Sequence, residues 1–95
     1  MPNLIWSGKS AKDMQRLYCF IALKNSHAAT RAVAAIRSGA QLLEEFPEVG
    51  KPIENMVAGY RDWPIAFGNS GYILRYHFDG KTIFVVGIRH QREKS

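Results

Sequence analysis

The most informative hydrophobic pattern lies at residues 71–90, where two runs rich in aromatic and β-branched residues flank Asp79-Gly80. Asp-Gly between such runs is a strong signal for a tight hairpin turn, because both residues tolerate positive φ angles. The pattern therefore predicts that residues 72–78 and 82–90 form paired antiparallel strands. A lone hairpin is only marginally stable in water, so the rest of the chain is expected to supply a further strand and a cover for the apolar face.

The N-terminal part changes from a short apolar run to a helical period. Residues 3–6 predict a first strand, or an arm that pairs with a sheet edge. From about Ser7 the apolar residues recur at i, i+3, i+4 and i+7; they are Met14, Leu17, Tyr18 and Ile21. This spacing predicts an amphipathic helix that ends near Lys24. Ser7 or Ser10 is its expected cap, with Asp13 as the partner of Ser10 in a capping-box-like pair.

A second helix is predicted over residues 27–46, with Ser26 as its cap. Its apolar positions fall on one side; they are Ala29, Val33, Ile36, Ala40 and Leu43. Only about two residues separate the helices, so they must fold back as an antiparallel pair. Pro47 ends the second helix, because a proline ring disfavours helical geometry in the residue before it.

The remaining predicted strand covers residues 60–67. Pro64 within it cannot donate a ladder hydrogen bond, which indicates an open sheet edge or a bulge. Residues 68–71 turn the chain into the hairpin, and the tail after His90 is polar and expected to fray. The element order β-α-α-β-β-β predicts a single α+β domain over residues 1–95, with an antiparallel helix hairpin packed on a small antiparallel sheet.

The hairpin register decides which residues face the helices, because strand side chains alternate between the two faces. With a two-residue turn, Arg75 and Arg89 lie on opposite faces. With a three-residue turn that includes Lys81, they share one face, together with Ile73, His77, Ile83 and Val85. We favour the second register, because it gathers the charges and gives the helix side a core of Tyr72, Leu74, Tyr76, Phe84, Val86 and Ile88.

The composition is that of an ordinary globular chain, with 46% apolar and 22% charged residues. Cys19 is the only cysteine, which excludes an intrachain disulfide and a zinc site built on cysteines. No apolar run approaches the length of a membrane span, and the N-terminus lacks the pattern of a signal peptide. We therefore expect a soluble protein of the reducing cytoplasm, without a metal or cofactor.

The formal net charge of +5 is unevenly distributed, with +3 over residues 1–26, −1 over residues 27–57 and +3 over residues 58–95. This balance permits a nucleic acid or an acidic protein as partner and does not choose between them. The sequence contains no motif for nucleotide hydrolysis, zinc proteolysis or serine hydrolysis.

Candidate chemistry gathers at the end of the last strand. His90 lies inside the cluster Arg89-His90-Gln91-Arg92, where a histidine could act as a general acid or base near pH 7. A solvated basic strand end is the simpler alternative. His27 and His77 are expected at the surface. The aromatic residues are expected in the core rather than as a platform for nucleic-acid bases; they are Trp6, Tyr18, Trp63, Tyr72 and Tyr76.

The chain resembles the RelE/ParE superfamily, the toxins of bacterial type II toxin–antitoxin modules. The matching segments follow the family's order along nearly the whole chain; they are Leu-Leu-Glu-Glu-Phe-Pro-Glu-Val-Gly-Lys-Pro at 42–52, Arg61-Asp62-Trp63, Gly71-Tyr72 with Arg75-Tyr76, Asp79-Gly80, and Ile88-Arg89-His90-Gln91-Arg92-Glu93. The resemblance implies the same β-α-α-β-β-β fold and action in the bacterial cytoplasm. It also implies a small antitoxin whose C-terminal segment wraps the toxin in a higher-order hetero-oligomer.

The superfamily has two branches that differ in activity. The RNase branch cuts mRNA on the ribosome with basic sheet residues and a C-terminal Tyr or His, whereas the best-known ParE members poison DNA gyrase by binding it. Here Ile73 stands where the RNase branch often has an arginine, and Pro64 and Ala66 stand where its lysines would lie. The RNase set that remains is incomplete and consists of His90, Arg89 and Arg92. The resemblance is therefore closer to the ParE branch.

The resemblance implies a function and a set of binding residues. We expect a growth-inhibiting toxin that binds DNA gyrase without catalysis of its own. The alternatives are a ribosome-dependent mRNA endoribonuclease and a degenerate protein that only binds its antitoxin. The residues expected to contact the target are Arg61, Arg75, Arg89, His90 and Arg92. Those expected to contact the antitoxin are Leu17, Tyr18, Trp63 and Arg75.

Overall fold

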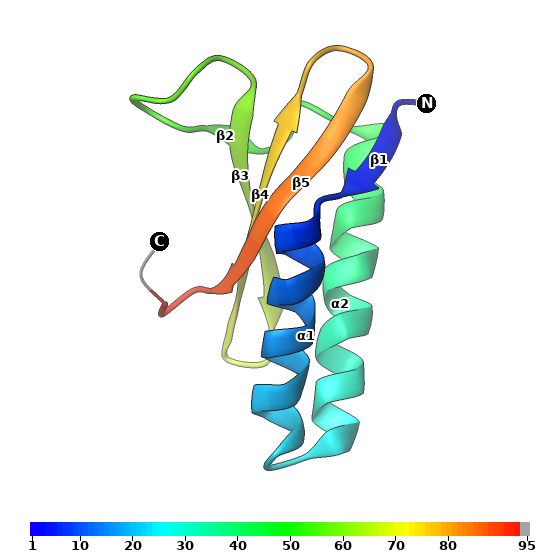
Figure 1. The fold of residues 1–95 in the computed structure, drawn as a ribbon, viewed down its shortest axis with the longest axis vertical. Coiled ribbons are helices and arrows are strands. Elements are labelled where there is room, and N and C mark those ends of the chain that lie inside the picture. Colours follow the sequence, from blue (N-terminus) through cyan, green and yellow to red (C-terminus); the bar gives the residue numbers. More distant parts are fainter. Residues whose placement is uncertain (94–95) are drawn as a thin grey trace.

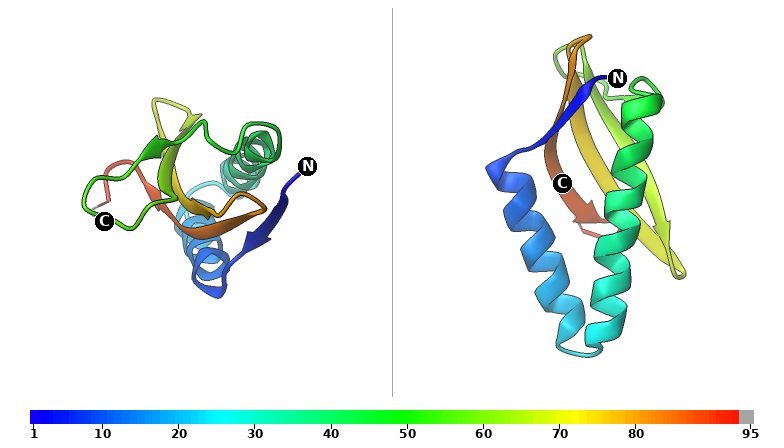
Figure 2. Two further views of the ribbon diagram at one scale, coloured as in Figure 1. Left: turned by 90° about the horizontal axis from the view of Figure 1, so that it is seen from above. Right: turned by 90° about the vertical axis from the view of Figure 1, so that its right-hand side faces the viewer.

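The computed structural model describes residues 1–93 and has two layers, a five-stranded sheet and a helix hairpin that covers one of its faces (Figures 1 and 2). In chain order the elements are β1 (Asn3–Trp6), α1 (Gly8–Ala22), α2 (Ser26–Glu45), β2 (Lys51–Pro52), β3 (Tyr60–Phe67), β4 (Ser70–Phe78) and β5 (Thr82–His90). The predicted α+β fold, with two helices followed by the strands of the main sheet, is confirmed. Among residues 1–93, no helix is long and apolar enough to cross a membrane.

The sheet differs from the expected one at both of its edges. The strand order is β1-β5-β4-β3-β2, and β1 runs parallel to β5 as far as Trp6 and Val85. The prediction of a purely antiparallel sheet was therefore wrong. At the other edge, the short strand β2 pairs with Arg61 and Asp62 of β3, which leaves the edge open at Pro64. The direction of β1 could not be predicted, because its partner strand lies at the far end of the sequence.

Both helices begin at a capping side chain; Ser7 was one of the two expected caps of α1, whereas Asn25 was not expected for α2. Ser7 Oγ caps α1 by accepting a hydrogen bond from the Ser10 N–H at 3.0 Å. Asn25 Oδ1 caps α2 in the same way, also at 3.0 Å. These bonds satisfy N–H groups that the start of a helix leaves without partners. The predicted Ser10–Asp13 pair and the Ser26 cap were wrong, because all three residues already lie inside the helices.

The core lies between the helix hairpin and the sheet. Its completely buried members include Ile36, Leu43, Leu74, Tyr76, Ile83 and Val85. The helix α2 approaches β3 closely at Gly39, where a Cβ atom would lie 2.7 Å from the Ile65 side chain. Tyr18, which was expected in the core, is instead 38% exposed. The buried positions of α1 are Ser10, Asp13 and Leu17, so the face that α1 turns inward is more polar than the predicted stripe.

The predicted hairpin turn is confirmed in length but not in register. Three residues, 79–81, separate β4 from β5. Phe78 lies opposite Ile83, one position further along β5 than expected. Ile83 and Val85, which were expected beside the arginines, are therefore completely buried, and Phe84, expected in the core, is 42% exposed.

A bulge in β5 then brings the two arginines back to one face. The strands β4 and β5 pair regularly as far as Val85, after which the register shifts so that Arg75 lies opposite Gly87. A β-bulge adds one residue to one strand and so reverses its alternation. Arg75 and Arg89 consequently line one hollow on the sheet, as the favoured register predicted. Val86, expected in the core, lies at the bulge.

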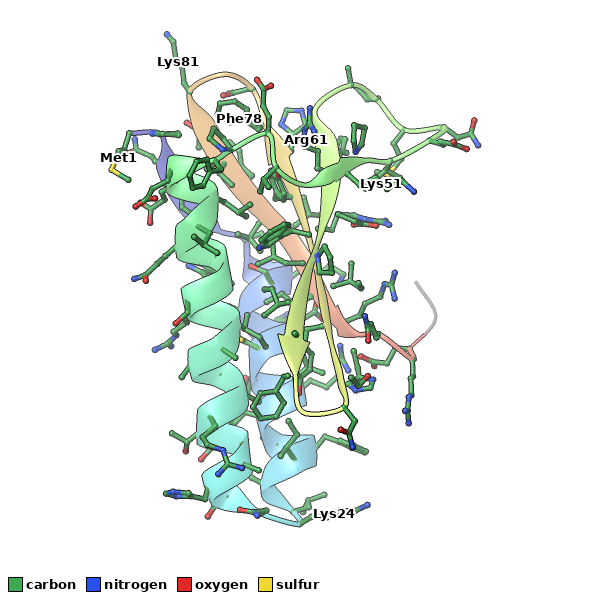
Figure 3. The ribbon with its side chains drawn as sticks, turned by 180° about the vertical axis from the view of Figure 1, so that it is seen from behind. Met1, Lys24, Lys51, Arg61, Phe78 and Lys81 are labelled. Atoms are coloured by element: carbon green, nitrogen blue, oxygen red, sulfur yellow. The ribbon has the colours of Figure 1, made fainter. Side chains whose placement is uncertain are left out.

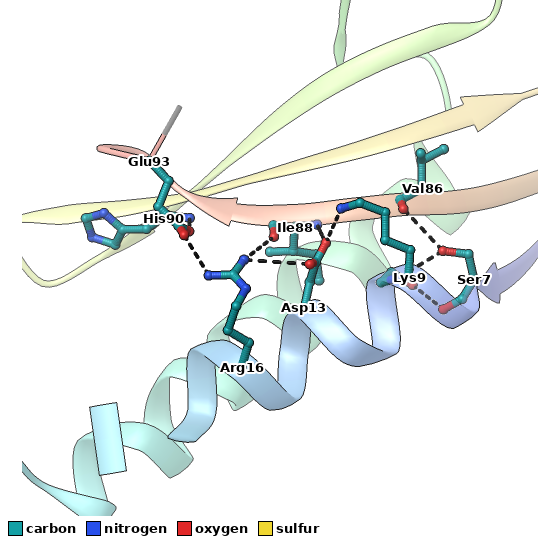
Figure 4. A network of polar contacts seen from close by, with 9 residues as sticks. Ser7, Lys9, Asp13, Arg16, Val86, Ile88, His90 and Glu93 are labelled. Atoms are coloured by element: carbon teal, nitrogen blue, oxygen red, sulfur yellow. Dashed lines mark hydrogen bonds and ion pairs between the residues drawn. The ribbon is translucent and has the colours of Figure 1, made fainter. Parts of the chain in front are cut away.

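The second half of β5 has no neighbouring strand on one side, and side chains around α1 take that place (Figure 4). The strand β1 accompanies β5 only as far as Val85. Beyond it, Ser7 Oγ donates to Val86 O at 3.2 Å, and Asp13 Oδ2 accepts the Ile88 N–H at 3.0 Å. An edge strand with unpaired N–H and C=O groups invites pairing with another chain. These side chains satisfy such groups within the monomer.

Asp13 is the centre of this contact. Its side chain also accepts a hydrogen bond from Lys9 Nζ at 2.8 Å, and Arg16 Nη2 lies 3.6 Å from its other oxygen. Burial raises the pKa of the Asp13 carboxyl, but the hydrogen bonds from Lys9 and from the Ile88 N–H, with the two positive charges, outweigh it. The pKa therefore lies below its ordinary value of 3.8. Gly87 leaves the space for this arrangement, since a Cβ atom there would lie 2.9 Å from Lys9 Nζ.

The connection between α2 and β3 is fixed by two side chains of the sheet. Tyr76 Oη donates to Pro47 O at 2.8 Å and accepts the Gly50 N–H at 2.9 Å. Arg61, labelled in Figure 3, donates from Nη1 to Glu48 O at 2.8 Å and to Gly50 O at 2.7 Å. Buried polar groups are costly unless they are paired. The loop after α2 is thus a positioned part of the fold rather than a loose connection.

Asp13→Ala should lower the free energy of unfolding by about 2–3 kcal/mol, because it leaves the Ile88 N–H unpaired in a buried position. Urea denaturation at neutral pH measures this loss. Glu54→Ala, which removes an exposed carboxylate, is the matched control and should change stability by less than about 0.5 kcal/mol. Equal stability of the two variants would contradict the role given to Asp13.

The same carboxylate predicts a pH dependence. Because the native pKa of Asp13 is lowered, its stabilisation is fully present above the unfolded pKa of about 3.9 and is lost as the pH falls through the native pKa. The stability difference between wild type and Asp13→Asn should therefore be constant near neutral pH and shrink in acid. A difference that persists unchanged below the native pKa would refute this assignment.

Tyr76→Phe should lower the free energy of unfolding by about 1–3 kcal/mol, because Pro47 O and the Gly50 N–H both lose their partner. Tyr18→Phe removes a hydroxyl from an exposed ring and should leave stability nearly unchanged. Thermal unfolding of the two variants, followed by circular dichroism, compares them directly. If both are as stable as the wild type, the loop is not held by Tyr76.

Candidate functional site

The first candidate surface is a hollow on the sheet face that points away from the helices; we call it the basic hollow. Its volume is about 200 Å³, and its lining includes Lys9, Asp62, Ile73, Arg75 and Arg89. Arg75 donates two hydrogen bonds to the Asp62 carboxylate, one from Nε at 2.9 Å and one from Nη2 at 3.2 Å. Hydrogen bonding to Asp62 raises the pKa of Arg75 above its ordinary value. The guanidinium is therefore both charged and fixed in direction.

Each cation of the basic hollow is held by one acceptor and keeps further donors. Lys9 is bonded to Asp13 at 2.8 Å, and Arg89 Nη1 donates to Glu93 O at 3.1 Å. A lysine has three N–H donors and an arginine has five. The hydrogen bonds of Lys9, Arg75 and Arg89 therefore use only some of the N–H donors of each side chain. The basic hollow can bind an external carboxylate or phosphate while its cations stay oriented by the protein.

His90 lies on the other face of the sheet from Arg89, because neighbouring side chains of a strand alternate. It pairs opposite Tyr72, and the two rings meet edge to face with centroids 5.5 Å apart. Its Nδ1 accepts the Arg92 N–H at 3.1 Å. Of the three residues of the RNase alternative, Arg89 therefore stands apart, since it lines the basic hollow while His90 and Arg92 lie together on the other side of the sheet.

The second candidate surface is a groove of about 710 Å³ beside α1; we call it the α1 groove. Its apolar lining consists of Leu17, Phe20, Ile21, Phe67 and Tyr72, and its polar lining consists of Arg16, His90, Arg92 and Glu93. Phe20 is 69% exposed although it is aromatic. Apolar side chains that gather on an open surface are typical of a site for another molecule. The α1 groove is thus the stronger candidate for a protein contact.

The turn at residues 91–93 contributes Arg92 and Glu93 to the α1 groove, and Figure 4 shows Glu93 beside Arg16. Glu93 Oε1 accepts the His90 N–H at 2.7 Å, and Glu93 Oε2 lies 2.6 Å from Arg16 Nη1. The prediction that the tail frays was therefore wrong for these three residues. Residues 94–95, which belong to the same prediction, lie outside the described part of the chain.

The five residues expected to contact the target do not gather on one surface. Arg75 and Arg89 share the basic hollow. His90 and Arg92 line the α1 groove. Arg61 is bound to backbone carbonyls of the loop after α2, which makes it part of the scaffold. The structure thus divides four members of this set into two pairs on different surfaces.

The four residues expected to contact the antitoxin are also dispersed. Leu17 lies in the α1 groove but is only 5% exposed. Tyr18 is open to solvent on α1. Trp63 is half-buried, and its indole N–H donates to Gly39 O at 3.0 Å. Arg75 lies in the basic hollow on the opposite face.

Sequence reasoning missed Lys9, Arg16 and Phe20 as members of these surfaces. Phe20 follows Leu17 by three positions, a helical spacing that could have extended the apolar stripe. The two cations carry no such signal, because their partners in β5 and in the turn at 91–93 are distant in sequence. Among residues 1–93, no group of three or more His, Cys, Asp or Glu side chains could hold a metal ion.

The relatives of this chain are named as bacterial toxins. It is 27% identical over 92 residues to Toxin RelE1 of Caulobacter vibrioides, covering 97% of this chain and 96% of that protein. It is 28% identical over 87 residues to Toxin RelE3 of the same organism, covering 90% of each.

A solved structure and a family profile match over nearly the whole chain. The structure, described as the chromosomal ParDE TA system from P. aeruginosa, has the same fold with a TM-score of 0.72 at 23% identity, covering 95% of this chain and 96% of that chain. The profile described as ParE toxin of type II toxin-antitoxin system, parDE, matches residues 4–95. The protein therefore belongs to the ParE toxin family of type II toxin–antitoxin systems.

Proposed function

We propose that this toxin inhibits growth by binding DNA gyrase in the cytoplasm, without catalysis of its own, and that a cognate antitoxin neutralises it. The observation that carries the proposal is the separation of His90 from Arg89 on opposite faces of the sheet. Cleavage of RNA through its 2′-hydroxyl needs a base, an acid and cations around a single phosphate. A poison that acts by binding needs only a surface.

The basic hollow supplies a surface suited to gyrase. Lys9, Arg75 and Arg89 come from three different elements and line one hollow. Complementary charge speeds association and fixes the orientation of a complex. An acidic patch of gyrase, or the DNA that gyrase holds, fits this charge.

An antitoxin partner is supported by the family, and by the similar structure whose description names a ParDE system. The α1 groove is the surface that supports it on this chain, because its apolar lining is open. An amphipathic segment can bury its apolar face in such a groove. The target and the antitoxin would then contact different faces of the toxin.

A ribosome-dependent endoribonuclease remains the second candidate. Two observations favour it: the relatives named RelE1 and RelE3, and the common face of Arg75 and Arg89. In this case the cations of the basic hollow would hold the RNA phosphate. The base would have to come from a residue on that face, which His90 is not.

The purified toxin should inhibit supercoiling by gyrase or stabilise its cleavage complex. Arg75→Gln with Arg89→Gln should raise the toxin concentration needed by about tenfold or more, since each lost charged contact weakens binding by roughly 1 kcal/mol or more. Lys24→Gln with Arg31→Gln removes the same charge from exposed positions outside the basic hollow and serves as the control. Two results together would exclude gyrase as the target: a large excess of purified wild-type toxin has no effect on gyrase, and expression of the same toxin still kills cells.

Induction of the toxin should leave translated mRNA free of cuts in phase with codons, because His90 lies on the opposite face of the sheet from Arg75 and Arg89. Primer extension on abundant transcripts, with and without induction, tests this. His90→Gln should retain toxicity under the same conditions. Codon-phased cuts that vanish in His90→Gln would establish the endoribonuclease instead.

A further inference from the structure

The α1 groove combines an apolar wall with one ion pair that stands at its polar side. Arg16 and Glu93 both line it, and their side chains are 47% and 38% exposed. The pair is therefore accessible to a molecule that enters the groove. Arg16 Nη1 lies 2.6 Å from Glu93 Oε2, which shows that Arg16 can bind a carboxylate in the groove; we call this position of Arg16 the carboxylate seat.

Arg16 is oriented by the protein even without Glu93. Its second terminal nitrogen, Nη2, lies 3.6 Å from Asp13 Oδ1 and donates to Ile88 O at 3.4 Å (Figure 4). Both contacts come from the buried side of α1 and from β5. The seat would therefore persist if Glu93 left it, with Nη1 still directed into the groove.

Glu93 is held mainly through its own turn. Its backbone N–H donates to His90 O at 2.9 Å, and its Oε1 accepts the His90 N–H at 2.7 Å. The turn follows the last strand, so a shift of Glu93 requires no change in the core. An exposed ion pair contributes little to stability, and another carboxylate could replace it at nearly equal free energy.

The charge around the groove selects an acidic occupant. Arg16 and Arg92 line it, and Glu93 is the acidic residue of this lining. If a carboxylate from outside replaced Glu93, the cations of the groove would keep a partner and the apolar wall would be covered at the same time. Complementary charge of this kind sets the register of a bound segment more than its affinity.

We propose that Glu93 holds the place of an antitoxin carboxylate: the antitoxin segment lays apolar side chains in the α1 groove, and one of its acidic residues takes Arg16 from Glu93. This inference rests on the antitoxin partner of the proposed function. Apolar burial supplies most of the affinity, whereas the exchange of carboxylates fixes the position of the segment. Glu93 acts as an internal competitor that weakens binding.

The test compares affinities for the purified product of the reading frame that neighbours the toxin gene, measured by isothermal titration calorimetry. Glu93→Gln should bind about twofold to fivefold more tightly than wild type, because the competitor for Arg16 is gone. Arg16→Gln should bind about tenfold more weakly. In Arg16→Gln with Glu93→Gln the gain should disappear, because the two carboxylates no longer compete for a seat.

Glu54→Gln, an exposed carboxylate outside the groove, is the control and should match the wild type. Replacing each acidic residue of the antitoxin in turn by its amide should identify one position at which Glu93→Gln brings no gain. Unchanged or weaker binding by Glu93→Gln, while wild type forms a complex, would overturn this inference alone. Failure of the wild type to form any complex would overturn the proposed antitoxin partner and this inference with it.

Discussion

The fold depends on the way in which α1 completes the open edge of β5. The strand β1 ends beside Val85, so the rest of β5 would carry unpaired backbone groups. The buried carboxylate of Asp13 satisfies one of these groups by accepting the Ile88 N–H, and it also pairs with Lys9 and Arg16. The contact fixes the distance of α1 from the sheet. It also explains why a carboxylate is buried in the inward face of α1, since the alternative is a buried N–H without an acceptor.

The same contact sits at the bulge that separates the two candidate surfaces. Gly87 provides the space for Lys9 and Asp13, and the register shift next to it sends Arg89 to the basic hollow and His90 to the α1 groove. Without the extra residue, the alternation along β5 would exchange these two side chains. The contact that stabilises the edge of β5 and the bulge that separates the two candidate surfaces therefore lie at one point of one strand.

The elements that could be predicted are those whose signal is local. Helical spacing located α1 and α2, and Asp79-Gly80 located the hairpin. The direction of β1, the pairing of Phe78 with Ile83 and the role of Asp13 could not be predicted, because each depends on contacts between distant parts of the chain. The sequence predicted correctly that Arg75 and Arg89 share one face, but it did so from an incorrect register, which placed Ile83 on the same face as the arginines instead of in the core. Two deviations, the shifted pairing and the bulge, compensate each other there, and alternation alone reveals neither.

The two surfaces are not independent, because Glu93 contacts both. Its side chain binds Arg16 in the α1 groove, and its backbone O accepts a hydrogen bond from Arg89 in the basic hollow at 3.1 Å. A carboxylate that displaces Glu93 from Arg16 therefore also changes the acceptor available to Arg89. Coupling of this kind is reciprocal, so a ligand that draws Arg89 away from Glu93 would loosen the turn over the groove in return. If the antitoxin and the target bind these two faces as proposed, one bound partner would alter the affinity of the toxin for the other.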